Sequence, residues 1–503
     1  MNVFLNLWIK DSPFRLETLR DIHRMVDVDA FMVACDEKSG YDHVRLSDAS
    51  QTYSGIQFGG YVMTCTTLPF GWKASPFIYQ SIGLSVTSYL REYSITNSLY
   101  IDDRFLSSSN FTSAGQSYDQ AKRLAYVMLS LLTRLGYTLS LNKCTLEPTT
   151  CLKYLGLYID SVKQAYILPD DKKVKFIELR DYVLSRKNVD IKTLQRFSGK
   201  CISMALAVPG CRLFTREVNR AISRCSKHSR MVDVDSDLRK ELEHWKFIDS
   251  WQGALLWRPE FHKTIDMATD SSQFRYGAVV KLGNSEINLG DYWPEGDNRP
   301  IHLKEADAVL KSLQSLDVSL RNSRVDVSVD NMAVISVWGN HGGRDTRLNS
   351  IIKEIFNCVV TLNMDLHMKF VPSSLNLADG ESRILNASDT MLSSKSWLEV
   401  ESIYGPHSVD LMALDSNTMT LSDGTPLRHF TPTFSPLSSG VNVFCQTLES
   451  ESNPYVFPPY GMIFPILCFL EQQHVECTVV VPQIRPLPIW WPMINNAGMI
   501  SHI

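Results

Sequence analysis

Three stretches decide how the first third of the chain is expected to fold: FMVACD at residues 31–36, LPFGWKASPFIYQ at residues 68–80 and LYIDDRF at residues 99–105. The first is an apolar run that ends in Asp36, the pattern of a buried strand that carries a carboxylate to its exposed end. The third places the adjacent Asp102 and Asp103 between apolar flanks, as at the tip of a β-hairpin. Two adjacent aspartates cannot both be buried without cations, so this hairpin tip predicts a metal site.

Asp36, Asp102 and Asp103 together can form a clamp for two metal ions. In such a clamp one ion activates an attacking 3′-hydroxyl, and the other holds a triphosphate and the leaving oxygen. Hard oxygen ligands suit Mg²⁺. An isolated Asp-Asp pair is more often a solvated turn, so the surrounding motifs must decide between the two interpretations.

The order of those motifs resembles the palm of retroelement reverse transcriptases. A D-x-x-x-G-Y segment begins at Asp36, an LPFGxxxSPxxxQ segment follows, and a YxDD segment comes third. The resemblance continues with Lys143 in LNKCTL, which is similar to the lysine of the family's motif D, and with the Tyr154-Leu155-Gly156 turn in KYLGL, which is similar to its primer grip.

The resemblance implies a role for each matching residue. Asp36 and Asp102 would be the main metal ligands, with Asp103 beside them. Tyr41 would be a steric gate that excludes a ribose 2′-hydroxyl, and Lys143 would protonate or neutralise the leaving pyrophosphate. The other expected contacts to nucleotide, template or primer are Gly71, Tyr100, Leu155 and Gly156. Taken alone, Tyr41 could equally be a packed strand aromatic and Lys143 a surface lysine.

A second set of carboxylates lies between residues 264 and 383. TIDMATDSSQFRYGAVV predicts two strands joined by a turn, IHLKEADAVLKSLQSL an amphipathic helix and RVDVSVDN a half-buried strand. These segments, followed by VPSSLNLADGESR, resemble a ribonuclease H domain. The resemblance implies a site for two Mg²⁺ ions made by Asp270, Glu305, Asp330 and Asp379. Asp266 and Asp326 are expected to be solvent-exposed, and His302 to be structural.

Charge is unevenly distributed along the chain of 503 residues, whose net charge is −4. Residues 170–230 contain 15 Lys and Arg against 6 Asp and Glu, a local charge of +9. Such an island is either a solvated helix face or a surface that contacts phosphates. Because reverse transcriptases place a helical thumb on the template–primer after the palm, the resemblance favours the phosphate-facing interpretation.

The segment LQRFSGKCISMALAVPGCRLFTR, and the tail stretches that begin at His407, Pro454 and Val479, resemble tyrosine-recombinase retroelements of the DIRS type. In the reverse transcriptase family a basic fingers hairpin precedes the segment that is similar to NLWIKDSPFRLETL, which here starts at Asn6. We therefore expect the chain to be N-terminally truncated, with a partial fingers region. A pararetroviral or LTR-type polymerase is a further interpretation, which the tail and the absence of an integrase signature weigh against.

The expected fold class is an α+β multidomain protein: a palm with partial fingers, a helical thumb and an α/β ribonuclease H-like domain with a mixed sheet. The expected domains are residues 1–160 for partial fingers and palm, 161–258 for thumb and connection, 259–385 for the ribonuclease H-like domain and 386–503 for a C-terminal tail.

The expected function is an RNA- and DNA-directed DNA polymerase with ribonuclease H activity, carried on a retrotransposon polyprotein. Its cofactors would be Mg²⁺ or Mn²⁺, two ions per active site, and its partners an RNA template, a DNA primer, an RNA–DNA hybrid and dNTPs. The alternative is a truncated or domesticated remnant that binds nucleic acid without catalysis. The 11 scattered cysteines and the early charges after Met1 predict an intracellular protein, cytoplasmic or nuclear, without a signal peptide or membrane segment.

Overall fold

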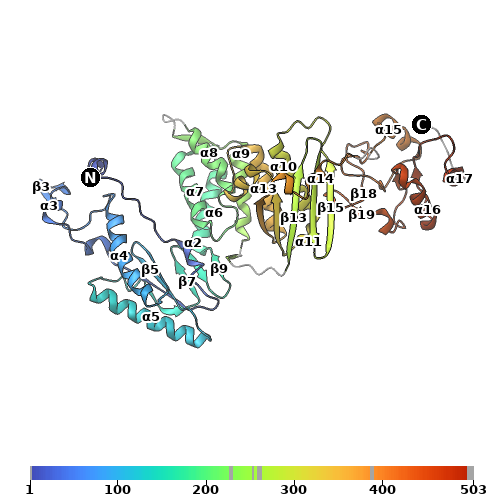
Figure 1. Ribbon diagram of the computed structural model, residues 1–503. Helices are drawn as coiled ribbons and strands as arrows, with labels where there is room; N and C mark the ends of the chain where they lie inside the picture. The colour runs from blue at the N-terminus through green and yellow to red at the C-terminus, as the bar shows by residue number, and fades with distance from the viewer. Residues whose placement is uncertain (1–2, 226–229, 252–253, 258–262, 386–389, 496–503) are drawn as a thin grey trace. The chain divides into compact units, whose positions relative to one another are not determined.

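The computed structural model describes residues 3–225, 230–251, 254–257, 263–385 and 390–495. The chain forms two compact units, Met1–Pro259 and Glu260–Ile503 (Figure 1). Within the described ranges, no helix combines the length and the apolar character needed to cross a membrane.

Unit 1 contains a four-stranded antiparallel sheet in the order β4-β5-β1-β6. Its strands are β4 (Asn97–Tyr100), β5 (Asp103–Ser107), β1 (Met32–Asp36) and β6 (Thr145–Thr149). The predicted strand and hairpin are therefore present, with Asp36 at the end of β1 and Asp103 at the start of β5. The pairing of β1 with β5 places these two aspartates directly opposite each other.

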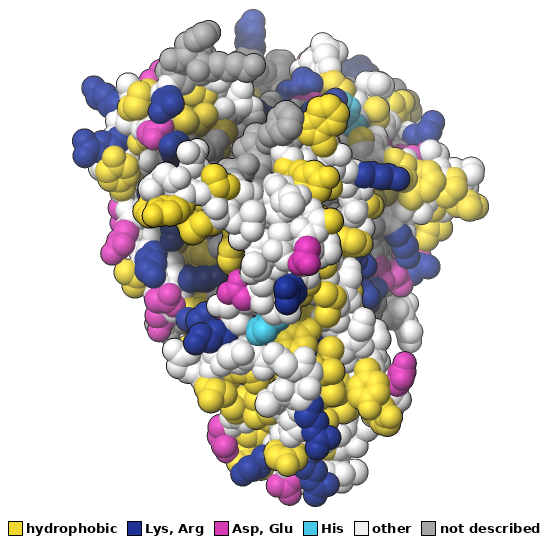
Figure 2. Space-filling model, turned by 90° about the vertical axis from the view of Figure 1, so that its left-hand side faces the viewer, with side chains coloured by type: hydrophobic (Ala, Val, Ile, Leu, Met, Phe, Trp, Pro, Cys, Tyr) yellow, Lys and Arg dark blue, Asp and Glu magenta, His cyan; other side chains and the backbone are white. Residues whose placement is uncertain are grey.

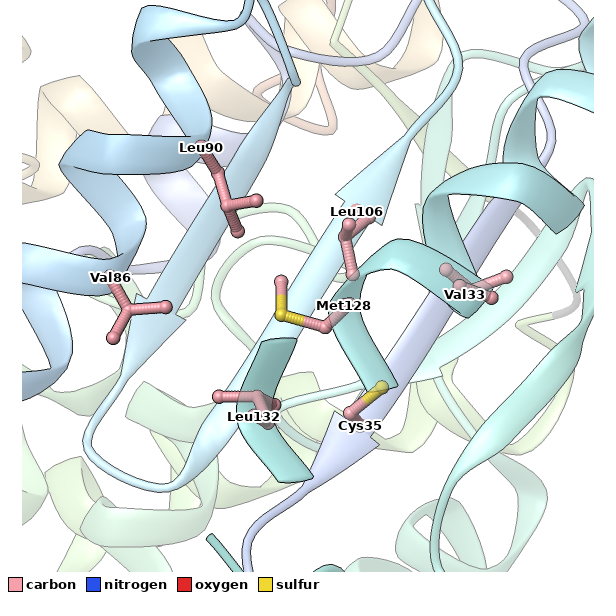
Figure 3. Close-up of a cluster of buried hydrophobic side chains, with 8 residues drawn as sticks. Val33, Cys35, Val86, Leu90, Leu106, Met128 and Leu132 are labelled. Atoms are coloured by element: carbon pink, nitrogen blue, oxygen red, sulfur yellow. The ribbon is translucent and has the colours of Figure 1, made fainter. Parts of the chain in front are cut away.

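Two long helices, α4 (Ser75–Glu92) and α5 (Ala114–Arg134), cover this sheet. Their apolar side chains meet those of β1 and β5 in one core, as Figure 3 shows. The labelled members are Val33, Cys35, Val86, Leu90, Leu106, Met128 and Leu132. Full burial of an aliphatic side chain stabilises a fold by roughly 1.5–3 kcal/mol. The core therefore fixes the two strands that carry the aspartates.

A second antiparallel sheet follows, in the order β12-β9-β8-β7. Its strands are β7 (Cys151–Tyr154), β8 (Leu157–Asp160), β9 (Ala165–Ile167) and β12 (Ala254–Leu256). The two-residue turn between β7 and β8 consists of Leu155 and Gly156, with φ angles of +45° and +83°. A hairpin loop of this length favours positive φ at both positions, which explains the glycine.

The segment expected to form the helical thumb and connection, residues 161–258, is mainly helical in its described part. Its helices are α6 (Asp170–Leu184), α7 (Ile191–Met204), α8 (Arg216–Arg224) and α9 (Ser236–His244). Phe176, Phe197 and Trp245 form a buried aromatic cluster between them. The pattern did not predict the short paired strands β10 (Asn188–Asp190) and β11 (Met231–Asp233).

The remaining elements of the first 65 residues are short. They are the helices α1 (Val3–Trp8), α2 (Leu19–Ile22) and α3 (Asp48–Gln51), the 3-10 helix η1 (Gly40–His43) that carries Tyr41, and the hairpin of β2 (Gly55–Phe58) with β3 (Tyr61–Thr64). Every residue of that hairpin is exposed.

Unit 2 begins with a five-stranded mixed sheet in the order β15-β14-β13-β16-β17. Its strands are β13 (Thr264–Ser271), β14 (Arg275–Leu282), β15 (Ser285–Tyr292), β16 (Arg324–Val329) and β17 (Asp365–Phe370). The first three pair antiparallel, whereas β16 and β17 run parallel to β13. The accompanying helices are α10 (Ile301–Ser315), α11 (Asp317–Leu320), α12 (Met332–Gly339), α13 (Thr346–Thr361) and α14 (Asp379–Ser382).

The apolar stripe predicted for the helix at residues 301–316 is buried, as expected for the inner face of α10. β16 alternates as predicted, with Val325, Val327 and Val329 inside. The third strand of the antiparallel part, β15, was not anticipated because its sequence, SEINLGDY, is mostly polar.

The C-terminal part of unit 2 contains a small set of parallel strand pairs. β18 (Phe430–Thr431) pairs with β19 (Gly440–Val441), and β20 (Tyr455–Val456) pairs with β21 (Thr478–Val479). Asp410 forms parallel bridges with His429 and Tyr455 and so lies between the two pairs. The helices of this part are α15 (Ser394–Tyr404), α16 (Ile463–Gln473) and α17 (Trp491–Asn495).

Gly277 of β14 provides a test of how closely α14 packs on the sheet. A Cβ at this position would lie 2.6 Å from the carbonyl carbon of Glu381 and against the backbone nitrogen of Ser382. Because backbone atoms cannot rotate away, we expect Gly277→Ala to destabilise unit 2 by about 1–3 kcal/mol. Urea unfolding of the full chain, with hydrogen exchange of peptides from β14 and α14, would measure the loss.

Gly339→Ala is the matched control, because a Cβ at Gly339 would meet no atom within 4 Å. We expect this helical glycine to accept alanine without loss of stability. Equal stability of the two variants would show that α14 does not lie against β14 as described.

Candidate active site

The first candidate site is the acidic end of the sheet in unit 1. Asp36 ends β1, and Asp102 and Asp103 occupy the tip of the β4–β5 hairpin. The tip is held by a positive φ of +56° at Ile101 and by a hydrogen bond of 3.0 Å that the Glu37 backbone N–H donates to the Asp102 carbonyl. The three predicted carboxylates therefore come from adjacent strand ends.

Mutual repulsion and burial disfavour negative charge at this tip. Burial, together with the charge of Asp36, raises the pKa of Asp102. Burial and the charges of Asp102 and Asp36 raise the pKa of Asp103 to about 6. Lys143 partly offsets the repulsion, since its Nζ lies 3.5 Å from Asp36 Oδ1. The ligand atoms of Asp36, Asp102 and Asp103 do not all lie within 4.8 Å of one another among the described residues, so the predicted convergence of the three carboxylates is not met here. A divalent cation bound at this tip would have to draw them together.

A cavity of about 380 Å³ adjoins the tip. Tyr41, Gly71, Tyr79 and Asp102 contribute to its wall. Its volume is within the range of small-molecule sites. Gly71 lies in the cavity wall and has a φ of +83°, a backbone conformation that favours glycine.

The loop at Gly71 is held by the N-terminal segment. Asn6 Nδ2 donates to the Gly71 carbonyl at 2.9 Å, and Asn6 Oδ1 accepts from the Lys73 backbone N–H at 3.0 Å. The side chain of Asn6 thus fixes the cavity wall, a role that the sequence did not reveal because the partners lie 65 or more residues apart.

The other expected contact residues lie on both sides of the hairpin. Tyr100 pairs with Asp103 in the β4–β5 ladder. Leu155 and Gly156 form the β7–β8 turn, and the preceding Tyr154 donates its hydroxyl to the Asp103 carbonyl at 3.1 Å. Tyr154, absent from the predicted site residues, therefore connects that turn to the acidic tip.

Two further charged residues near the tip were missed by the sequence interpretation. Glu37 and Arg104 directly follow Asp36 and Asp103, and each is about 1% exposed. Arg104 Nε lies 2.5 Å from Glu37 Oε1. The sequence feature that could have indicated this ion pair is the presence of two opposite charges, Glu37 and Arg104, each next to a predicted metal ligand in an apolar segment.

The second candidate site is in unit 2. Ligand atoms of Asp270, Glu305 and Asp330 lie within 4.8 Å of one another. Among the described residues, this is the only group of three or more His, Cys, Asp or Glu side chains that lie so close together. They come from β13, α10 and the residue after β16, as the sequence predicted. The fourth expected member, Asp379, begins α14, but its Oδ1 accepts a hydrogen bond of 2.7 Å from Arg383.

Hydrogen bonds orient this cluster. The Ser271 backbone N–H donates to Glu305 Oε1 at 3.2 Å, and Ser373 Oγ donates to Asp330 Oδ2 at 2.6 Å. Ser382 Oγ donates to Asp270 Oδ2. The serines were not anticipated as part of the site.

Burial and like charge act strongly on the second cluster. Burial, followed by the charges of Asp270 and Asp330, raises the pKa of Glu305 to about 9. Burial also raises the pKa of Asp270, with contributions from the charges of Asp330 and Asp379. Glu305 Oε2 is buried and has no hydrogen-bond partner. A divalent cation would give this unpaired oxygen a partner and would neutralise the neighbouring carboxylates.

Asp266, Asp326 and His302, which are outside the metal site predicted from the sequence, do not belong to the cluster of Asp270, Glu305 and Asp330. Asp266 is exposed, as predicted. Asp326 was predicted to be exposed but is half-buried, because its carboxylate pairs with Arg324 at 2.9 Å. His302 Nε2 lies 3.2 Å from Asp345 Oδ2.

The basic segment at residues 170–230 is mainly surface. Its exposed cations are Lys175, Arg186, Lys187, Lys192, Arg196, Arg212, Arg224 and Arg230. Arg180 is an exception, because it is buried and pairs with Asp249 at 2.7 Å. Figure 2 shows Lys and Arg side chains spread among hydrophobic ones over one face of the molecule.

Curated relatives include Protein P of two strains of duck hepatitis B virus, Germany/DHBV-3 and China. Each is 26% identical over 192 residues, which is 37% of this chain and 22% of the relative. The chain thus spans about a fifth of the length of these relatives.

Similar solved structures include foamy viral protease-reverse transcriptases. One, the dRH form in complex with double-stranded DNA, is 15% identical with a TM-score of 0.43, covering 72% of this chain and 60% of that one. Another, in complex with an RNA/DNA hybrid, is 14% identical with a TM-score of 0.41, covering 76% and 49%.

A family model matches the part of the chain that holds the first acidic site. The family is described as reverse transcriptase (RNA-dependent DNA polymerase), and the match covers residues 8–159. This stretch includes the hairpin with Asp102 and Asp103, the strand with Asp36 and the cavity beside them. Residues 8–159 are therefore a reverse transcriptase domain.

Proposed function

We propose that this chain is an RNA- and DNA-directed DNA polymerase with ribonuclease H activity, part of a retrotransposon polyprotein of the DIRS type that acts inside the cell. The observation that carries the polymerase is the cavity of about 380 Å³ with Asp102 and Tyr41 in one wall. It combines metal-type ligands and room for a nucleotide within a reverse transcriptase domain.

Asp36, Asp102 and Asp103 would hold the catalytic metal pair in this proposal. Two bound Mg²⁺ or Mn²⁺ ions would activate a primer 3′-hydroxyl and stabilise the charge that develops on the triphosphate. The 3′-oxygen attacks the α-phosphorus, the bond from that phosphorus to the bridging oxygen breaks, and pyrophosphate leaves. Lys143, 3.5 Å from Asp36, is placed to donate a proton to the leaving group or to neutralise it.

Tyr41 would select deoxynucleotides. Its ring lies in the cavity wall and is backed by Phe70, with ring centroids 5.1 Å apart, and by Tyr79 at 5.7 Å. A ring held in this way cannot easily yield to a 2′-hydroxyl. The exposed cations of residues 170–230 would contact the phosphates of an RNA template and DNA primer as a thumb.

The ribonuclease H proposal rests on the cluster of Asp270, Glu305 and Asp330. With Asp379 these residues would hold two divalent ions across a phosphate of the RNA strand in an RNA–DNA hybrid. For Asp379 to join the cluster, its carboxylate would exchange the hydrogen bond from Arg383 for the metal.

Removal of a polymerase carboxylate should abolish synthesis. We expect Asp102→Asn to lower the rate of primer extension on an RNA template at least about a hundredfold, because several kcal/mol of charge stabilisation are lost and each 1.36 kcal/mol is tenfold in rate. Asp48→Asn, at a side chain that is 95% exposed, is the control. Extension by Asp102→Asn at the control's rate would refute the assignment.

Tyr41→Ala should relax sugar selection. Without the ring, a ribonucleotide would fit beside Asp102, so incorporation of rNTPs relative to dNTPs should rise about tenfold or more. Single-nucleotide extension with matched dNTP and rNTP measures the ratio. A ratio equal to that of the wild type would remove Tyr41 from the role of gate.

The nuclease assignment predicts separate effects on activity and stability. Asp330→Asn should abolish Mg²⁺-dependent cleavage of RNA in a hybrid while leaving metal-free stability unchanged or higher, since it relieves carboxylate repulsion. Asp326→Asn, next to the cluster in sequence but paired with Arg324, is the control. Cleavage by Asp330→Asn as fast as by Asp326→Asn would contradict the proposal, as would cleavage in excess EDTA.

A further inference from the structure

A buried ion pair lies directly beneath the acidic tip of the reverse transcriptase domain. Glu37 and Arg104 follow Asp36 and Asp103 in the chain, and their side chains are each 1% exposed. Arg104 Nε donates to Glu37 Oε1 at 2.5 Å. Two apolar side chains of similar volume would commonly be as stable as such a pair, so stability alone gives no reason for charges here.

The pair is bonded to α4. Tyr79, which is 1% exposed, donates its hydroxyl to Glu37 Oε2. Arg104 Nη1 donates to Thr87 Oγ1 at 3.4 Å, about two turns further along the same helix. Glu37 therefore has each of its oxygens in use, one for the neighbouring strand and one for the helix.

Tyr79 in turn supports the backbone and ring of the proposed gate. Its ring centroid lies 5.7 Å from that of Tyr41, with the ring planes at 79°. A Cβ added at Gly40 would lie 2.7 Å from Tyr79 Cζ, so the Tyr79 ring fills the space directly against the residue before the gate. Both tyrosines line the cavity that contains Asp102.

The contacts form one continuous series from Arg104 through Glu37 and Tyr79 to Tyr41. The hydrogen bond from its hydroxyl holds the Tyr79 ring in one position, because a rotation of the side chain would leave a buried carboxylate oxygen of Glu37 without its donor. A phenylalanine would fill the same space but would be free to move. The Tyr41 ring could then move aside and make room for a ribose 2′-hydroxyl.

We propose that Tyr79, anchored by the buried Glu37–Arg104 pair, is a positioning residue that fixes the ring of Tyr41 and thereby sets the discrimination between dNTP and rNTP. The inference rests on the proposed polymerase function and extends it to the residues that make the gate rigid. It predicts that a hydroxyl group which touches no substrate determines sugar selectivity.

The test uses the full chain bound to an RNA template and a primer that ends in a dideoxynucleotide, so that binding is measured without chemistry. The dissociation constants of the next matched dNTP and rNTP are determined for each variant. We expect Tyr79→Phe to leave dNTP binding within about twofold and to lower the rNTP/dNTP ratio of dissociation constants about tenfold, an effect of the size that small misplacements produce.

Two further variants separate positioning from a merely structural role. The double variant Glu37→Leu/Arg104→Leu removes the anchor without leaving an unpaired charge, and it should lower the ratio as Tyr79→Phe does. Tyr79→Phe added to Tyr41→Ala should lower the ratio no further than Tyr41→Ala alone, since residues that act in one series are not additive.

Tyr118→Phe is the control. Tyr118, on α5, also donates its hydroxyl to a carboxylate, that of Glu147, but it does not line the cavity. Its ratio should equal that of the wild type. If the wild type discriminates and both Tyr79→Phe and the double variant keep its ratio, or weaken dNTP and rNTP equally, the positioning role is wrong. If the wild type binds no matched nucleotide on template–primer, the proposed polymerase function fails, and this inference fails with it.

Discussion

The antiparallel pairing of β1 with β5 determines the geometry of the acidic site in unit 1. It sets Asp36 opposite Asp103 and brings Asp102 to the adjoining tip. The arrangement is electrostatically unfavourable without cations, as the raised pKa values of Asp102 and Asp103 indicate. The apolar core that α4 and α5 form on the two strands, drawn in Figure 3, opposes this repulsion and keeps the ligands together.

In unit 2, too, the fold holds carboxylates together against their mutual repulsion, although other elements carry them. There a strand, a helix and the end of a parallel strand bring Asp270, Glu305 and Asp330 together, and burial makes the repulsion stronger. Serine hydroxyls and a backbone N–H satisfy some of the oxygens, while Glu305 Oε2 remains unpaired. In both units the fold therefore holds carboxylates close together against their mutual repulsion, and we propose that a divalent ion relieves it.

Much of this arrangement could be predicted because it is local. An apolar run that ends in Asp36, a hairpin with two aspartates at its tip and a valine alternation that ends before Asp330 each fix a carboxylate at the end of an element. Asp379, the fourth expected carboxylate, likewise stands at the first residue of an element, the short helix α14. Short-range periodicity is sufficient for such features.

What could not be predicted depends on contacts between distant segments. The roles of Asn6, Tyr79, Tyr154 and Ser382 arise from hydrogen bonds to partners between 42 and 112 residues away. The burial of Glu37 and Arg104 also escaped the pattern, because charged residues beside metal ligands are expected to face solvent. The strand β15 was missed since pairing, and not apolar content, makes it a strand.

We propose that the acidic tip of unit 1 is a metal-dependent polymerase site. Its most direct test is addition of one matched dNTP to a DNA primer on an RNA template by the full chain, across a Mg²⁺ titration. We expect no addition in EDTA, retained template–primer binding, and a rate that depends on more than one Mg²⁺ ion. Addition without a divalent ion, or a bound template–primer that is never extended at any Mg²⁺ or Mn²⁺ concentration, would contradict it.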